Sequence, residues 1–228
     1  VLPGGLDPRS PAAPAAADTA AAEPWLARAR DAVGADVGRL EGFEARTKLV
    51  VEQAPVTEAR VSWRRDGTLR RERAVLGERV VTELDGERWS ESLGEVRKSV
   101  PAREATWLRH EMQRHPLMLL AAHARGELRF RPVAQRRVGD RELMVLEAVD
   151  ERFDRLRVHL DVESNLVRVV ESWERSADDA IVHVRDTWSD YRQIGALRVP
   201  HLCRTTWNDD QRRGETVWFE WAPVLAPR

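Results

Sequence analysis

The sequence predicts a mainly β, α+β protein built on one large curved antiparallel sheet, with a helix before the sheet and a helical pair in its middle. Three observations carry this prediction. From Gly42 onward most segments alternate apolar and polar residues with the period of two that a half-buried strand requires. Asp66-Gly67 and Asp85-Gly86 are hairpin signals, because both residues of such a turn can take positive φ. The regular strand–helix alternation that a parallel sheet requires is missing.

The chain begins with a segment that differs in composition from the rest. Residues 1–22 are dominated by Ala, Pro and Gly, so burial cannot offset the entropy of ordering them. We expect a disordered linker or tail there, tethering a single domain, residues 23–228, to an upstream anchor or domain. A first helix is expected at residues 24–33, with Pro24 in its first turn.

Two groups of period-two segments give roughly eleven or twelve strands. The first group is expected at residues 42–52, 56–65, 68–76, 78–84 and 87–92. The second group is expected at residues 127–136, 141–149, 155–162, 166–174, 180–190, 197–208 and 214–222. Each group therefore reads as an antiparallel meander.

A helical segment separates the two groups. Trp107, Leu108 and Met112 share one helical face, and Pro116 is expected to break the helix. A second short helix then covers residues 117–124 and begins with the most apolar stretch of the chain. We expect this pair to form a central helical plug of the curved sheet.

Composition excludes several classes of function. The chain has 37 basic and 38 acidic residues, a net charge of −1, which argues against a nucleic-acid-binding protein. No apolar run approaches the length of about 18 residues that a transmembrane helix needs. Cys203 is the single cysteine, so neither an intramolecular disulfide nor a cysteine-based zinc site can form.

Motifs for catalysis are also missing. The chain has no nucleophile elbow and no glycine-rich phosphate loop. His110-Glu111 and His115 approximate a zinc motif, but five helical residues rotate the second histidine by about 140° from the first. We therefore expect solvated or helix-capping histidines and predict neither a metal, a cofactor nor a catalytic residue.

Structural roles explain the other polar clusters in the sequence. His201 and Cys203 share a strand face, and the cysteine is expected to be a small buried residue. The pairs Asp178-Asp179 and Asp209-Asp210 are expected in turns. The basic run at residues 70–73, with Arg64-Arg65 across the turn, is expected to be paired or solvated; contact with a phosphate or lipid headgroup is the alternative.

Three segments resemble the outer-membrane lipoprotein carrier (LolA/LolB-like) superfamily. They are VGDRELMVLEA at 138–148, HLDVESNLVRVVES at 159–172 and SDYRQIGALRVPHLCRTTW at 189–207. The resemblance covers residues 24–224 and consists of a pattern of turns and strands, without a catalytic signature. It implies an unclosed β-barrel whose open concave side is plugged by helices.

The resemblance also implies a function. We expect a non-enzymatic, exported bacterial domain, periplasmic or envelope-associated, that binds a hydrophobic or lipidated ligand such as lipoprotein acyl chains. Similar domains occur behind insulinase-type zinc proteases, so the alternative is an accessory or interaction domain of a larger envelope protein.

A ligand would lie in the concave face. Strand alternation predicts an apolar wall from Trp63, Val158, Val184 and Trp188, with Trp207 or Trp218. The covering lid would come from Trp107, Leu108, Met112 and residues 117–120, of which Leu117, Leu119 and Leu120 are the expected ligand contacts. The alternative is that these helices simply seal the core. Sequence cannot separate the two, because a ligand-binding wall and a buried wall have the same composition.

Overall fold

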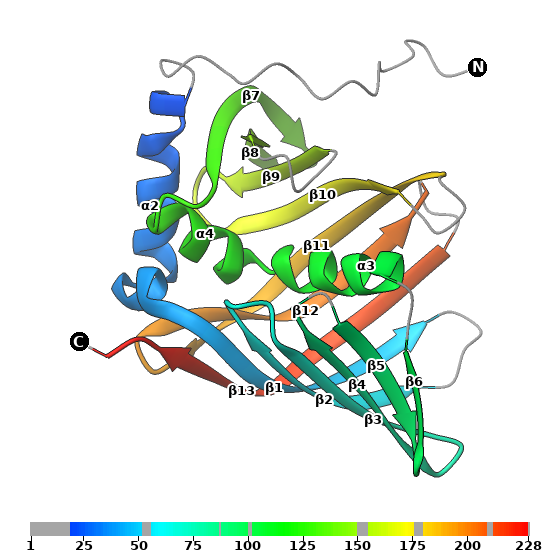
Figure 1. Cartoon of the computed structure of the whole chain (residues 1–228). Helices are drawn as coiled ribbons and strands as arrows, with labels where there is room; N and C mark the ends of the chain where they lie inside the picture. Colours follow the sequence, from blue (N-terminus) through cyan, green and yellow to red (C-terminus); the bar gives the residue numbers. More distant parts are fainter. Residues whose placement is uncertain are drawn as a thin grey trace.

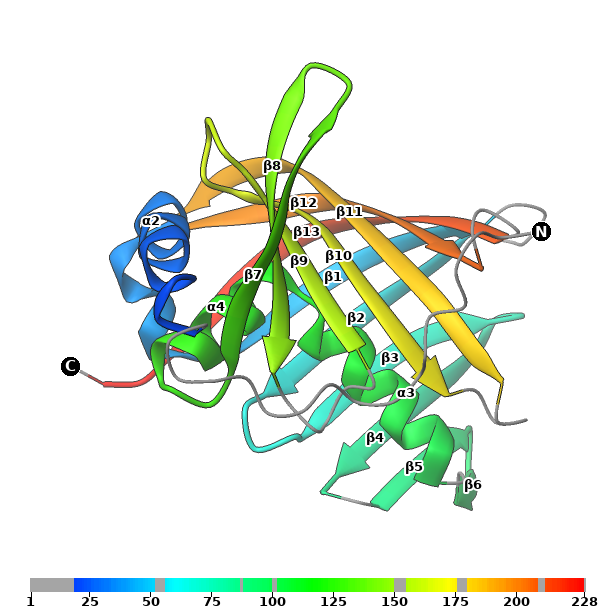
Figure 2. The same ribbon diagram turned by 90° about the horizontal axis from the view of Figure 1, so that it is seen from above.

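The protein is described by a computed structural model, which covers residues 19–51, 56–86, 88–99, 102–149, 155–175, 180–208 and 212–227. All the strands in this part of the chain form one 13-stranded sheet, and every pairing is antiparallel. The sheet is strongly curved, and helices lie in its concave side (Figures 1 and 2). The predicted fold class is confirmed.

The first six strands are β1 (Leu40–Val51), β2 (Thr57–Arg64), β3 (Leu69–Val75), β4 (Glu78–Asp85), β5 (Arg88–Leu93) and β6 (Val96–Ser99). The remaining strands are β7 (Arg129–Val138), β8 (Arg141–Val149), β9 (Arg155–Asp161), β10 (Val167–Arg175), β11 (Ile181–Ile194), β12 (Leu197–Trp207) and β13 (Arg212–Leu225). The expected count of eleven or twelve was too low because β6 was missed. Its residues are all exposed, so its sequence carries no apolar alternation.

The strand order explains why the barrel is not closed. The order is β6-β5-β4-β3-β2-β1-β13-β12-β11-β10-β9-β8-β7, so β1 and β13 pair in the middle while β6 and β7 are the two edges. The chain connects these edges through α3 (Ala102–Gln113) and α4 (Pro116–Ala124). The two helices therefore cross the concave face from one edge of the sheet to the other (Figure 2).

A third helix covers one end of the concave face. In α2 (Glu23–Val33) the buried residues are Leu26, Ala29 and Val33, and they belong to the same core as α4. The short 3-10 helix η1 (Ala35–Arg39) follows. Between them Gly34 has a φ of +115°, and a Cβ there would lie 2.1 Å from the carbonyl oxygen of Ala196. Only glycine allows α2 to sit this close to the turn between β11 and β12.

Both predicted Asp-Gly turns are present, but their geometry differs from the expectation. Gly67 and Gly86 have φ values of +89° and +57°, whereas neither Asp66 nor Asp85 has a positive φ. The Asp66 carboxylate instead accepts a hydrogen bond from the backbone N–H of Thr68, at 2.9 Å. The side chain thus stabilises the turn, and only its glycine takes the left-handed backbone.

Several expectations fall on residues outside this description. Most of the expected tail, residues 1–22, lies outside it, although Ala22 is described and buried at the start of α2. Asp178-Asp179 and Asp209-Asp210 also lie outside the described residues.

Candidate concave site and its two covering helices

The concave face has a continuous apolar centre. Strand register places Phe43 of β1 opposite Trp63 of β2, and Thr47 of β1 opposite Trp218 of β13. Trp188 lies on β11 opposite Cys203 of β12. All three tryptophans are buried, with exposures of 3–6%. Three of the expected wall residues are therefore brought together on one face.

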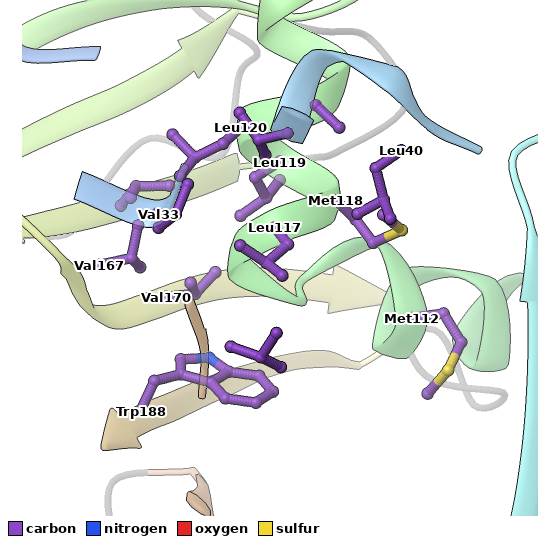
Figure 3. Close-up of a cluster of buried hydrophobic side chains, with 14 of the residues drawn as sticks. Val33, Leu40, Met112, Leu117, Met118, Leu119, Leu120, Val167, Val170 and Trp188 are labelled. Carbon is purple, nitrogen blue, oxygen red and sulfur yellow. The ribbon is translucent and has the colours of Figure 1, made fainter. Parts of the chain in front are cut away.

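Helix α4 is embedded in this apolar centre. Pro116 occupies its first turn, and residues 116–121 are all buried. Figure 3 shows Leu117, Leu119 and Leu120 among Val33 of α2, Leu40 of β1, and Val167 and Val170 of β10. Burying a leucine side chain contributes about 1.5–3 kcal/mol. Helix α4 therefore behaves as part of the protein core.

Helix α3 is attached differently. Leu108 and Met112 are its buried apolar side chains among those described. Glu111 forms an ion pair with Arg71 of β3 at 2.8 Å, and both side chains are partly exposed. Arg109 donates a hydrogen bond to the carbonyl oxygen of Gly86 at 2.5 Å. Polar contacts near solvent thus add to the burial of Leu108 and Met112 in holding this helix.

The junction of the two helices consists of Arg114 and His115, which we call the elbow. Arg114 is 2% exposed; its Nε donates to Asp186 Oδ2 at 2.9 Å, and its Nη1 donates to Glu174 Oε1. Ser172 donates to Glu174 at 2.7 Å, and Thr205 donates to Asp186 at 2.6 Å. Burial alone would lower the pKa of Arg114, but the two carboxylates raise it above its usual value. The network fixes the elbow to β10 and β11.

The other elbow residue enters an aromatic cluster. The His115 ring centroid lies 5.0 Å from Trp188, 5.4 Å from Trp218, 5.5 Å from Phe43 and 6.3 Å from Trp221. These four rings and His115 form what we call the His115 cluster. His115 is 1% exposed and makes no side-chain hydrogen bond as the N-cap of α4. The expectation of a solvated or capping residue was wrong for His115, because strands far apart in sequence enclose it.

The zinc-motif residues point to three different environments. Glu111 pairs with Arg71, and His110 Nδ1 lies 3.7 Å from Glu174 Oε2, while His115 lies among aromatic rings. Among the described residues, no group of three His, Cys, Asp or Glu side chains is arranged to hold a metal ion. Cys203 is buried, as expected, and burial raises the pKa of its thiol.

Two small hollows flank the covering helices. One, of about 50 Å³, lies under α3, and its apolar lining is Leu49, Ala59 and Val61 of the sheet, Met112 of α3 and Trp218. Its polar lining is Thr47, Thr57, Arg71, Arg73, Glu111 and Thr216. A second, also of about 50 Å³, lies beside α4 and includes Trp63, Met118 and Leu119 in its lining. Either is too small for an acyl chain, so a ligand of that size would require α3 or α4 to shift.

A larger hollow lies elsewhere. Its volume is about 1020 Å³, and its lining combines polar and charged side chains with Leu69, Leu84 and Trp89, which the register places on the same face as Trp63. Register places Arg70 and Glu83 in it on the face opposite Trp63, and these two side chains form an ion pair. The basic run is accordingly paired as expected: Arg71 with Glu111, Arg73 with Glu91, and Arg64 with Glu44.

The structure groups most of the expected site residues. Nine of them belong to the single buried core cluster: Trp63, Leu108, Met112, Leu117, Leu119, Leu120, Val158, Trp188 and Trp218. Val184 is also buried but lies outside that cluster, opposite the half-buried Trp207. Trp107 lies in α3, but its side chain is outside the described residues. Sequence reasoning missed Phe43, Trp221 and the elbow contacts.

Comparison with known proteins identifies the fold. No protein-family model and no curated protein matches the chain. A LolA superfamily protein from Nitrosomonas europaea has a TM-score of 0.57 at 9% identity, over 90% of this chain and 94% of that chain. A domain from Vibrio parahaemolyticus, described as an outer membrane lipoprotein-sorting protein, has a TM-score of 0.54 at 13% identity, over 93% and 94%.

A third solved structure agrees with these two. A DUF1329 family protein from Desulfovibrio piger has a TM-score of 0.59 at 11% identity, over 92% of this chain and 95% of that chain. Among the described residues no helix has both the length and the apolarity to cross a membrane. The chain has the unclosed β-barrel fold of LolA superfamily proteins, as the resemblance in its sequence predicted.

Proposed function

We propose that this protein is a non-enzymatic carrier that binds a hydrophobic or lipidated ligand between the concave face and α3. The observation that carries the proposal is the contrast between an apolar wall and the polar attachments of the helix over it. Leu49, Ala59, Val61 and Trp218 form the apolar part of the wall, whereas Glu111 and Arg109 attach α3 through polar contacts that solvent reaches. The similar folds of a LolA superfamily protein and of a domain described as outer membrane lipoprotein-sorting support this reading and favour a periplasmic or envelope location.

Moving α3 to open this site breaks contacts that water or the ligand can replace. A solvent-exposed ion pair contributes about 0–1 kcal/mol, and water can replace the hydrogen bonds that Arg71 and Arg109 make. The apolar contacts of Leu108 and Met112 would be exchanged for contacts with the ligand. The buried elbow would remain in place and act as the pivot. A carrier must both bind and release its ligand, and a helix held in this way allows both.

The test compares two variants at neighbouring positions of β2. Ala59 lines the hollow under α3, and Arg60 is exposed on the opposite face. Ala59→Trp should fill the site, whereas Arg60→Trp adds the same side chain outside it. Native mass spectrometry of gently purified protein, before and after organic extraction, detects a retained ligand. Tryptophan fluorescence measures the binding of added fatty acid or lipopeptide.

We expect an extractable adduct and a fluorescence change for the wild type and for Arg60→Trp, but neither for Ala59→Trp. Thermal unfolding of both variants checks that they fold. A wild type that neither retains a ligand nor responds to fatty acid or lipopeptide would overturn the proposal. That result would favour the alternative, an accessory domain of a larger envelope protein.

A further inference from the structure

The His115 cluster holds an unusual number of polar atoms without partners. Six buried atoms in and beside it have no hydrogen-bond partner: Nε1 of Trp188, Trp218 and Trp221, Nδ1 and Nε2 of His115, and Nε2 of His201. All five residues are at least nine-tenths buried. Each unsatisfied buried donor or acceptor costs about 1–3 kcal/mol, and native cores contain few of them. A region that serves only as apolar core would not concentrate them.

The unpartnered atoms are mainly donors. An indole N–H can only donate, which gives three donors. His201 Nδ1 lies 2.6 Å from the carbonyl oxygen of Trp218 and must donate to it, so its Nε2 is an acceptor in the neutral ring. Burial, and then the neighbouring His201, lower the pKa of His115 to about 3, so this neutral ring supplies one donor and one acceptor. The unpartnered atoms are therefore four donors and two acceptors. The excess of donors favours a ligand whose oxygen atoms accept hydrogen bonds.

The cluster adjoins the proposed ligand site. Trp218 lines the hollow under α3 and also packs against His115. Met112, which lines the same hollow, is three residues before His115 in the chain. A chain-like ligand lying under α3 against Leu49 and Val61 would therefore have one end at Trp218. That end meets N–H donors, while Leu49, Ala59 and Val61 lie along the rest of the ligand.

We propose that the His115 cluster binds the carbonyl end of an acylated ligand, with the indole N–H groups of Trp218, Trp188 and Trp221 donating to its ester, amide or carboxyl oxygens. The inference rests on the proposed function, because the acyl chain occupies the site under α3. It adds that the ligand needs oxygen acceptors at one end, so a pure hydrocarbon of the same length should bind more weakly.

The first experiment needs no variant of the binding site. Methyl laurate and tetradecane have similar length and apolar area, but only methyl laurate carries carbonyl and ester oxygens. Each is delivered from cyclodextrin to ¹⁵N-labelled protein, and the indole ¹H–¹⁵N resonances are followed. With methyl laurate, the indole proton resonances of Trp218, and of Trp188 or Trp221, should move downfield as hydrogen bonds form. With tetradecane they should not.

The second experiment removes single donors and keeps the rings aromatic. Trp218→Phe should weaken methyl laurate binding about five-fold more than it weakens tetradecane binding, because both ligands lose the same ring contact but only methyl laurate loses a hydrogen bond. Trp89→Phe is the matched control, because Trp89 on β5 also has a buried Nε1 without a partner but lies outside the cluster. It should change neither affinity. Thermal unfolding confirms that each variant is folded.

The possible results separate the inference from the proposed function. If both ligands bind equally and the indole resonances respond identically, the inference is wrong and the hydrophobic site stands. If the indole protons stay where they are in both complexes, the donors are satisfied by water only, and the inference is equally wrong. If neither ligand binds, the proposed function itself fails.

Discussion

Helices α3 and α4 cover the same concave face, yet they are held by different forces. Residues 116–121 of α4 are buried among side chains of α2, β1 and β10. Helix α3 buries Leu108 and Met112 and is otherwise attached by a partly exposed ion pair and a hydrogen bond to a backbone carbonyl. Apolar burial is lost completely when a helix leaves its site, but surface polar contacts are replaced by water. The same connection between the two sheet edges therefore contains a fixed segment and a movable one.

The elbow separates these two behaviours. Arg114 is tied to β10 and β11 by buried carboxylates, and His115 is enclosed by aromatic rings. Helix α3 can thus pivot at the elbow while α4 stays in place. The variants below test this division, beginning with the largest expected effect.

Arg114→Ala should produce the largest loss of stability. It leaves Glu174 and Asp186 buried at 4% exposure without their cation, and breaking a buried ion pair in this way costs about 3–5 kcal/mol. Urea unfolding at neutral pH measures the free energy. A loss below about 1 kcal/mol, the value of a surface pair, would show that the elbow is not an anchor.

Leu120→Ala tests the other half of the comparison. Leu120 is 1% exposed in α4, and truncating a buried leucine to alanine costs about 2–5 kcal/mol. On α3 the matched change is Arg109→Ala, which removes one surface hydrogen bond and should cost no more than about 0.5 kcal/mol. Equal losses in the two helices, measured by urea unfolding, would contradict the division into core and lid.

The fold was predictable because its signals are local. Period-two alternation and turn residues indicate strands wherever one face is buried, as at Leu156, Val158 and Leu160 of β9. Strand β6 escaped because exposed residues carry no such pattern. The helical pair was also visible, since Pro116 divides a polar helix from an apolar one.

The elbow was not predictable, because its partners are remote in sequence. Arg114 contacts Glu174 and Asp186, which lie 60 and 72 residues further along the chain. His115 is likewise enclosed by rings from β1, β11 and β13. The only local signal was an Arg-His pair between an amphipathic helix and the most apolar segment, where polar residues are expected at the surface.

His115→Phe should alter the pH dependence of stability. Burial holds the pKa of His115 at about 3, below the 6.5 of an unfolded histidine, so the folded state resists protonation. Its contribution is fully present above pH 6.5 and is lost as the pH falls towards 3. Wild-type unfolding free energy should fall with pH by about 1.4 kcal/mol per unit more than that of the variant.

This comparison is best made above the range in which carboxylates titrate. Glu147 and Glu171 accept hydrogen bonds from neighbouring Arg and His side chains, which overcome the effect of burial and lower their pKa values to about 2. Their stabilisation is lost only as the pH falls below the 4.5 of an unfolded glutamate. Identical slopes for wild type and variant between about pH 6 and 5 would mean that His115 is accessible to protons in the folded state.

The smallest effect on stability is expected for the ion pair between Arg71 and Glu111, the contact most relevant to the proposed function. Arg71→Met removes the ion pair with Glu111 and should change the unfolding free energy by about 0–1 kcal/mol. Amide hydrogen exchange should nevertheless accelerate in α3 and stay unchanged in α4, because only α3 loses an attachment. Arg70→Met is the control, since Arg70 pairs with Glu72 and Glu83 on the opposite face of β3. Equal acceleration in both helices would mean that they open as one body, and the elbow would then be a moving part of the lid.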